Sequence, residues 1–135
     1  QEDARIAYGI LVSGGNEVHH ALRLLRLIYT RDNLYVIHID GKTHKRYRKR
    51  LWRLCKDLSA AAGDPPPDNC LFCDPPTMVS WGAFSVVLAA LHALGLAVRA
   101  AHPWDYWINL SGSDMPLMTQ REAARVLGAH RHSNV

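Results

Sequence analysis

The chain has 135 residues, 48% of them apolar and 21% charged, which suits one modest folded core and leaves too little for two independent domains. With 7 prolines and 9 glycines, the composition excludes a collagen-like or a fully disordered chain. The formal net charge is +4, and eight of the 16 lysines and arginines lie between Lys42 and Lys56. We therefore expect any anionic partner to meet this stretch first.

The first predicted unit is a strand, a turn and a helix. Residues 6–12 form an apolar run that is closed by Ser13 and two glycines, and Asn16 offers a cap for the helix that follows. The apolar positions of this helix recur at helical spacing and are Val18, Ala21, Leu22, Leu25 and Ile28. The same order then repeats. Residues 34–39 predict a second strand that ends at Asp40, and a second amphipathic helix carries Tyr47, Leu51, Cys55 and Leu58 on its apolar face.

The second half continues the alternation. Residues 60–69, with three consecutive prolines, predict a surface loop, and residues 70–73 a short third strand. The Ala- and Leu-rich residues 84–101 predict a buried helix, and residues 106–110 a fourth strand. Thr119 and Glu122 match a capping box, and Gly128 marks the end of a last helix.

Strands that alternate with helices predict an α/β fold, with a mostly parallel sheet and helices on both faces. In such sheets, ligands bind at the carboxyl ends of the strands. Polar residues follow three of the predicted strands directly, at residues 13–16, 40–42 and 111–114. We therefore expect these three segments to form one binding rim.

Four blocks of sequence, at residues 6–16, 21–40, 79–85 and 104–120, resemble the core-2/I-branching family of glycosyltransferases, known as glycosyltransferase family 14. This family also contains peptide O-xylosyltransferases and plant β-glucuronosyltransferases. The most specific block is the last, which reads WDYWINLSGSDMPLMTQ from Trp104 to Gln120. The resemblance covers almost the whole chain, but it corresponds only to the amino-terminal part of the family's catalytic domain. Because the chain begins at Gln1 rather than at methionine, we expect it to be part of a longer protein.

The resemblance implies a GT-A-type fold that is incomplete in this chain, with residues 1–135 as the amino-terminal nucleotide-binding part of one catalytic domain. It implies an inverting transfer of GlcNAc, xylose or glucuronic acid from a UDP-sugar to a hydroxyl group of a glycan or glycoprotein. No cofactor is implied beyond the donor. It also implies a type II Golgi membrane protein with a lumenal catalytic domain and an upstream membrane anchor. The family's general base, a glutamate, lies in the later half, so we name no base here.

The resemblance assigns four substrate-binding residues to the first two strand ends. Asp40 suits hydrogen bonds to uracil or ribose hydroxyls, because a carboxylate accepts from two donors. Ser13 and Gly14 end the first strand where a backbone must lie close to the nucleotide. Lys42 takes the basic role that family members often place one residue earlier, at Gly41. Many members also carry a histidine and a basic residue in the first turn, and these are absent here.

Three further residues are carried over from the third and fourth blocks. Trp81 is expected to border the nucleotide pocket by packing and Ser85 by a hydrogen bond, while Asp114 is expected to contact hydroxyls of the donor sugar. Many GT-A enzymes hold a metal ion with an Asp-x-Asp pair, but no acidic residue stands two positions from Asp114. A single carboxylate is a poor Mg²⁺ site, so we expect transfer without a metal ion, with Lys or Arg side chains offsetting the diphosphate charge.

Ordinary structural roles stay open for the same residues. Asp40 and Asp114 also suit turn residues that bond the local backbone, and Trp81 suits a core aromatic. The basic stretch is compatible with a solvated helix face, or with a nucleic-acid or membrane-surface module whose contact face carries Lys45, Arg46, Lys49 and Arg53. A homologue that binds a sugar nucleotide without transferring the sugar is a third alternative.

The chain contains three cysteines: a single Cys-x-x-Cys pair, formed by Cys70 and Cys73, and the separate Cys55. A lone pair lacks the further ligands that a zinc site needs, and a framework of several disulfides is not expected. If the protein works in the oxidising lumen that the resemblance implies, Cys70 and Cys73 are expected to bond to each other or to a distant cysteine. Buried thiols are the alternative. No run of 18 or more apolar residues occurs, so these residues predict no membrane span.

Overall fold

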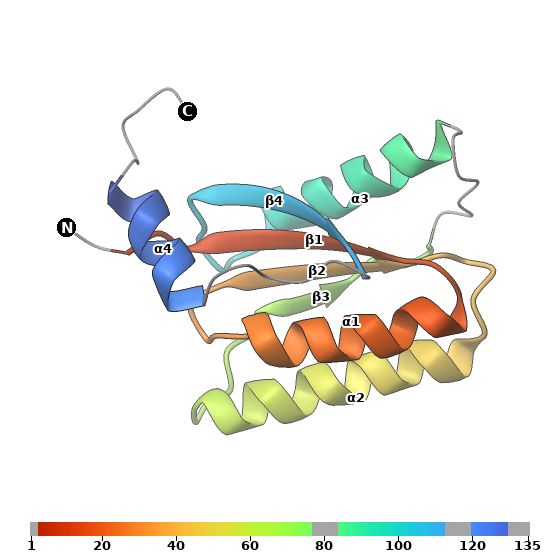
Figure 1. The fold of residues 1–135 in the computed structure, drawn as a ribbon, viewed down its shortest axis with the longest axis horizontal. Coiled ribbons are helices and arrows are strands. Elements are labelled where there is room, and N and C mark those ends of the chain that lie inside the picture. Colours follow the sequence, from red (N-terminus) through yellow and green to blue (C-terminus); the bar gives the residue numbers. More distant parts are fainter. Residues whose placement is uncertain (1–2, 77–83, 113–119, 130–135) are drawn as a thin grey trace.

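The computed structural model describes residues 3–76, 84–112 and 120–129, in which strands and helices alternate (Figure 1). The strands are β1 (Ile6–Val12), β2 (Leu34–Ile39), β3 (Cys70–Phe72) and β4 (Tyr106–Ser111). The helices are α1 (Gly14–Ile28), α2 (Lys45–Ala62), α3 (Ser85–Arg99) and α4 (Gln120–Ala129). The order of elements predicted from the sequence is confirmed.

The four strands form one parallel sheet in the order β3-β2-β1-β4. The register places Tyr8 of β1 opposite Tyr35 of β2, so side chains of the same face stand side by side across the sheet. Helices α1 and α2 lie next to each other on one face, and α3 lies on the opposite face (Figure 1). The expected α/β fold, with a parallel sheet between helices, is therefore confirmed for the described residues. Within them, no helix is both long and apolar enough to cross a membrane.

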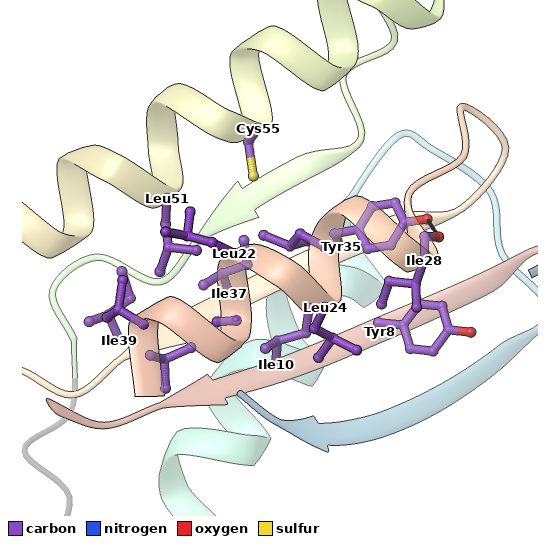
Figure 2. Close-up of a cluster of buried hydrophobic side chains, with 14 of the residues drawn as sticks. Tyr8, Ile10, Leu22, Leu24, Ile28, Tyr35, Ile37, Ile39, Leu51 and Cys55 are labelled. Atoms are coloured by element: carbon purple, nitrogen blue, oxygen red, sulfur yellow. Dashed lines mark hydrogen bonds between the residues drawn. The ribbon is translucent and has the colours of Figure 1, made fainter. Parts of the chain in front are cut away.

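The larger core lies between the sheet and the helices α1 and α2 (Figure 2). It is built from large branched and aromatic side chains, which are fully or almost fully buried; they include Ile10, Leu25, Tyr35, Ile37 and Leu51. The apolar faces of both helices are the ones predicted from helical spacing. Helix α4 extends this core through Ala123 and Leu127, and its backbone accepts a hydrogen bond from the Ala4 N–H group over 2.8 Å, at Ala124.

The smaller core lies between the sheet and α3, and here the sequence-based expectation was wrong. Three alanines spaced four residues apart, Ala89, Ala93 and Ala97, are the buried residues of α3. Most of the helix is therefore not buried, because only this narrow stripe of small side chains faces the sheet. Large apolar side chains on its other sides are exposed, namely Val87, Leu88, Leu91 and Val98.

The ends of three helices also differ from the predictions. Helix α1 begins at Gly14, with Ser13 rather than Asn16 at the N-cap position. Helix α2 continues to Ala62, beyond the expected start of the loop. Helix α4 ends at Ala129, and Gly128 is buried inside its last turn instead of terminating it. Helix ends depend on local contacts as much as on residue type, so their exact positions are poorly predicted from sequence.

All three cysteines are free thiols in this structure. Cys70 packs against the larger core and Cys73 against the smaller one, on opposite faces of the sheet. Side chains on opposite faces point apart, so a bridge between these two residues would require the backbone to rearrange. The expectation that they bond to each other is therefore wrong for this fold.

Candidate functional site

The segments that follow β1, β2 and β4 meet at one edge of the sheet, as predicted. The backbone N–H of Asp40 donates to the carbonyl oxygen of Val12 over 2.8 Å, and the N–H of Gly112 donates to that of Leu11, also over 2.8 Å. Strand β1 thus holds the ends of its two neighbours on either side. The carboxyl ends of three strands form a common rim, which we call the strand-end rim.

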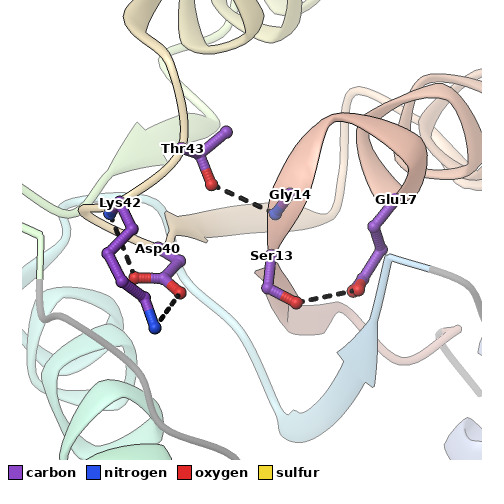
Figure 3. A network of polar contacts seen from close by, with 6 residues as sticks. All are labelled: Ser13, Gly14, Glu17, Asp40, Lys42 and Thr43. Atoms are coloured by element: carbon purple, nitrogen blue, oxygen red, sulfur yellow. Dashed lines mark hydrogen bonds and ion pairs between the residues drawn. The ribbon is translucent and has the colours of Figure 1, made fainter.

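Asp40 is the buried carboxylate of this rim, with 5% of its surface exposed. Its Oδ1 accepts a hydrogen bond from the backbone N–H of Lys42 over 3.2 Å, and its Oδ2 lies 3.6 Å from the Lys42 Nζ (Figure 3). The local backbone bond that was the ordinary alternative for Asp40 is therefore present. The same geometry places an exposed ammonium group beside the carboxylate, so the rim carries both charges that a nucleotide site would use.

Ser13 and Gly14 connect β1 to α1 and make two contacts with other residues of the rim (Figure 3). The Ser13 hydroxyl donates to Glu17 Oε2 over 3.0 Å, and the Gly14 N–H donates to the Thr43 hydroxyl oxygen over 3.1 Å. Gly14 has a φ of 74°, in the left-handed region that other residues rarely adopt. A substitution at Gly14 would therefore strain the turn that brings these two loops together.

Glu17 belongs to the rim although the sequence analysis did not select it. Its second oxygen, Oε1, accepts a hydrogen bond from the Gly112 N–H over 3.0 Å, so one carboxylate links the ends of β1 and β4. A Cβ atom at Gly112 would lie 3.0 Å from Glu17 Cγ, so a larger residue there would require the Glu17 side chain to shift. The spacing of Ser13 and Glu17, four residues apart at a helix start, was a usable signal. The partner at Gly112 was not visible from local sequence.

The remaining predicted site residues divide into one that the structure describes and two that it does not. Ser85 is the first residue of α3. This end of the helix lies toward the carboxyl ends of the strands, the same end of the sheet as the strand-end rim (Figure 1). Trp81 and Asp114 lie outside the described residues. Their roles at the donor site, and the contact expected for Ser85, stay predictions.

A buried histidine lies close to the rim on the face covered by α3. His38 of β2 is 1% exposed, and its ring centroid lies 6.2 Å from that of His92 on α3. Burial lowers the pKa of His38 from its ordinary value of 6.5; His92 and Arg48 lower it further, while Asp40 raises it. The neutral form of His38 is therefore favoured in the folded chain.

The basic stretch forms one wall of a groove between α1 and α2, with a volume of about 410 Å³. Leu22, Leu54 and the carboxylate of Asp57 line it. The other lining residues are five cationic side chains, namely Arg26, Arg46, Lys49, Arg50 and Arg53. Within the described part of the chain, none of the five forms an ion pair. Three of the four residues proposed for a basic contact face, Arg46, Lys49 and Arg53, are thus brought together, and Lys45 does not line the groove.

The described residues contain no group of three or more His, Cys, Asp or Glu side chains that could hold a metal ion. Asp114 is not among them, because residues 113–119 of the fourth block lie outside the described part of the chain. The expectation of a metal-independent reaction therefore stays a prediction.

A parallel sheet flanked by helices, with polar and charged groups gathered at its carboxyl edge, defines an α/β protein of the kind that binds ligands at that edge. The sequence profile of the core-2/I-branching enzymes matches residues 6–135, and the chain belongs to this family. The predicted family membership is confirmed.

Relatives of known name are similar along most of this chain. A probable beta-1,3-galactosyl-O-glycosyl-glycoprotein beta-1,6-N-acetylglucosaminyltransferase from Homo sapiens is 28% identical over 89% of this chain and 25% of its own length. A xylosyltransferase from Ciona intestinalis is 30% identical over 96% of this chain and 14% of its own length. A beta-glucuronosyltransferase from Arabidopsis thaliana is 31% identical over 90% of this chain and 26% of its own length. The chain thus spans about a quarter or less of the length of these relatives.

Proposed function

We propose that the intact protein is an inverting glycosyltransferase, which moves a sugar from a UDP-sugar to a hydroxyl group of a glycan or glycoprotein acceptor. Two observations support this: the chain belongs to the core-2/I-branching family, and its relatives carry the names of transferases for three different sugars. Those names differ in the sugar, so the donor is proposed as GlcNAc, xylose or glucuronic acid.

The observation that carries the proposal is the pairing of Asp40 with Lys42 at the strand-end rim. In the proposed complex, Asp40 accepts hydrogen bonds from uracil or ribose, because its carboxylate is held at the carboxyl end of β2. Lys42 is 58% exposed and can turn its ammonium group toward the diphosphate. The backbone at Ser13 and Gly14 borders the nucleotide from the neighbouring strand. Trp81, Ser85 and Asp114 complete the proposed donor site.

Calorimetry with UDP tests the nucleotide site in the intact protein. Asp40→Ala is expected to weaken UDP binding by about 1 to 3 kcal/mol, the range for hydrogen bonds to a charged group. Asp32→Ala is the matched control, since Asp32 is exposed at the opposite edge of the sheet, before β2. An unchanged dissociation constant for a folded Asp40→Ala variant would remove Asp40 from the site.

The proposed reaction needs no metal ion. Transfer by the intact protein is expected to continue in excess EDTA, because Lys and Arg side chains offset the charge of the leaving UDP. Asp114→Asn is then expected to impair the positioning of the donor sugar. Loss of transfer in EDTA, restored by Mn²⁺, would contradict this part of the proposal and point to a second carboxylate ligand.

Two alternative functions can be distinguished from the proposed transferase by binding and activity measurements. A homologue that only binds sugar nucleotides would bind UDP but transfer no sugar to any glycan acceptor. A nucleic-acid module is supported by the five cations of the groove between α1 and α2. That module predicts DNA binding that falls steeply with salt, in the absence of UDP binding.

We also propose that the catalytic domain works in the Golgi lumen, held by a membrane anchor upstream of these residues. The names of the relatives support this, because several describe transfer onto glycoproteins. Immunolocalisation of the intact protein against Golgi markers tests the compartment. A cytosolic distribution would contradict it.

A further inference from the structure

The surface between α2 and β3 holds two cysteines that are 15 positions apart in the chain, Cys55 and Cys70. Cys55 is buried on the face of α2 that covers the sheet, one helical turn after Leu51. In Figure 2 its sulfur atom points toward β3. Cys70 begins β3 and is in register with Tyr35, whose side chain lies in the same core as Cys55.

Cys70 is held in this direction by its neighbour Asn69, which is fully buried. The Asn69 side-chain amide donates to the carbonyl oxygens of Thr30 and Asn33, each over 3.0 Å, and its Oδ1 accepts from the Tyr29 hydroxyl over 2.9 Å. The Asn69 carbonyl oxygen also accepts from the N–H of Tyr35 over 2.8 Å. These four hydrogen bonds fix Asn69 just before Cys70, and the partly buried Cys70 packs against the same core as Cys55.

The two thiols line the same small cavity, of about 50 Å³, together with Trp52, Lys56 and Asp68. Their sulfurs are close enough to interact. A hydrogen bond with Cys55 is the largest cause that raises the pKa of Cys70, followed by burial. Cys73 is excluded from this arrangement because it packs against the other face of the sheet.

We propose that Cys55 and Cys70 form an intrachain disulfide, which ties α2 to the edge strand β3 when the protein meets a disulfide oxidant. Glutathione disulfide supplies the chemistry. One of the two thiols loses its proton, and the resulting thiolate attacks one sulfur of the oxidant and releases one glutathione thiolate. The other cysteine, as its thiolate, then attacks the protein sulfur of the mixed disulfide and releases the second glutathione thiolate. Two protein thiols lose two protons and two electrons, and one glutathione disulfide becomes two glutathione molecules. This proposal does not depend on the proposed transferase activity.

The bridge has a clear structural effect, because β3 is a short edge strand of three residues. It closes a loop of about 15 residues that contains the end of α2 and the proline-rich segment. Closing such a loop restricts the unfolded chain. It also ties the shortest described strand of the sheet to helix α2.

Disulfide mapping on the intact protein tests the pairing. The reduced protein is incubated with excess glutathione disulfide, its remaining thiols are alkylated under denaturing conditions, and proteolytic fragments are identified by mass spectrometry. We expect a fragment that joins Cys55 to Cys70, and an alkylated Cys73. Oxidation is expected to be faster at pH 9 than at pH 7, because the reaction requires thiolates. A bridge that contains Cys73, or full alkylation of Cys55 and Cys70, would overturn the proposal.

Variants provide a second measurement. Cys73→Ser is the matched control and is expected to keep the bridge, whereas Cys70→Ala removes it. Oxidation of the unmodified protein and of Cys73→Ser is expected to raise the midpoint of thermal unfolding of this region by about 5 to 10 °C. The Cys70→Ala variant is expected to show no shift on oxidation. An equal shift in Cys70→Ala would assign the effect to another pair and also overturn the proposal.

Discussion

The two faces of the sheet are covered by helices of different design. Helices α1 and α2 each bury large side chains against the sheet and turn charged residues toward solvent. Helix α3 buries three alanines and exposes larger apolar side chains; Val98 and the N-cap residue Phe84 are both 67% exposed. Helix α3 thus buries fewer residues than α1, although it is the more hydrophobic of the two. Overall hydrophobicity indicates that a helix has apolar surface to cover, and the size and spacing of its residues decide which side meets the sheet.

Close approach explains the alanine stripe. Gly9 of β1 faces the α3 side, and a Cβ atom there would lie 2.3 Å from a ring carbon of Trp107, so this face is already filled by the indole. The Trp104 Nε1 donates to the Ala97 carbonyl oxygen over 2.9 Å and brings the end of α3 down on the sheet. Small residues on α3 are what such a contact allows.

The largest expected effect comes from the face of α1 and α2. Leu51→Ala is expected to lower the free energy of unfolding of the intact protein by about 2 to 5 kcal/mol, because Leu51 is fully buried among large side chains. Leu27→Ala, on an exposed position of α1, is the control and is expected to change it by less than about 0.5 kcal/mol. Equal losses in chemical denaturation would show that the two positions are packed alike.

On the opposite face, adding volume is expected to do harm. Ala93→Leu is expected to cost about 1 to 3 kcal/mol, because Ala93 is fully buried in the smaller core and three more carbon atoms would overpack it. Val98→Leu adds volume at an exposed position of the same helix and is expected to be neutral. Stabilisation by Ala93→Leu would mean that α3 is loosely packed, and it would remove the contrast between the faces.

Acid is expected to weaken the α3 face through His38. The folded-state pKa of His38 lies below its unfolded value of 6.5, so the unfolded chain takes up the proton first as the pH falls. The free energy of unfolding should therefore decrease as the pH drops below 6.5, and this contribution should stop changing once the pH is below the folded-state pKa. His38→Leu is expected to flatten the profile in this range, whereas His20→Leu, at an exposed position, leaves it unchanged. Parallel profiles for both variants would contradict a neutral buried His38.

The smallest expected effect on stability is at the exposed outer side of α3. Leu91 is 54% exposed in the described structure, so Leu91→Gln is expected to change the stability of the intact protein by less than about 0.5 kcal/mol. Denaturation of the intact protein measures it. A loss of several kcal/mol would instead show that this apolar surface is covered in the intact protein.

The candidate site shows the same limit of local sequence as the two faces. The strand-end rim could be predicted, because polar residues follow apolar strands directly and parallel strands end at one edge. Asp40 and Lys42 were found in this way. The roles of Glu17 and Thr43 could not be found, since their partners, Gly112 and Gly14, lie 95 and 29 positions away along the chain.

The sequence by itself determined the order of the strands and helices, the bounds of β1 and β2, the parallel sheet and the family. Each of these depends on local apolar runs, on helical spacing or on matched blocks of residues, which can be read along the chain. Only the tertiary structure decided which side of α3 is buried, that Cys70 faces Cys55 rather than Cys73, and that Glu17 joins two strand ends. Those outcomes depend on the register of neighbouring strands and on the direction in which each side chain leaves the sheet. Residues adjacent in sequence point to opposite faces there, while residues far apart in sequence share one.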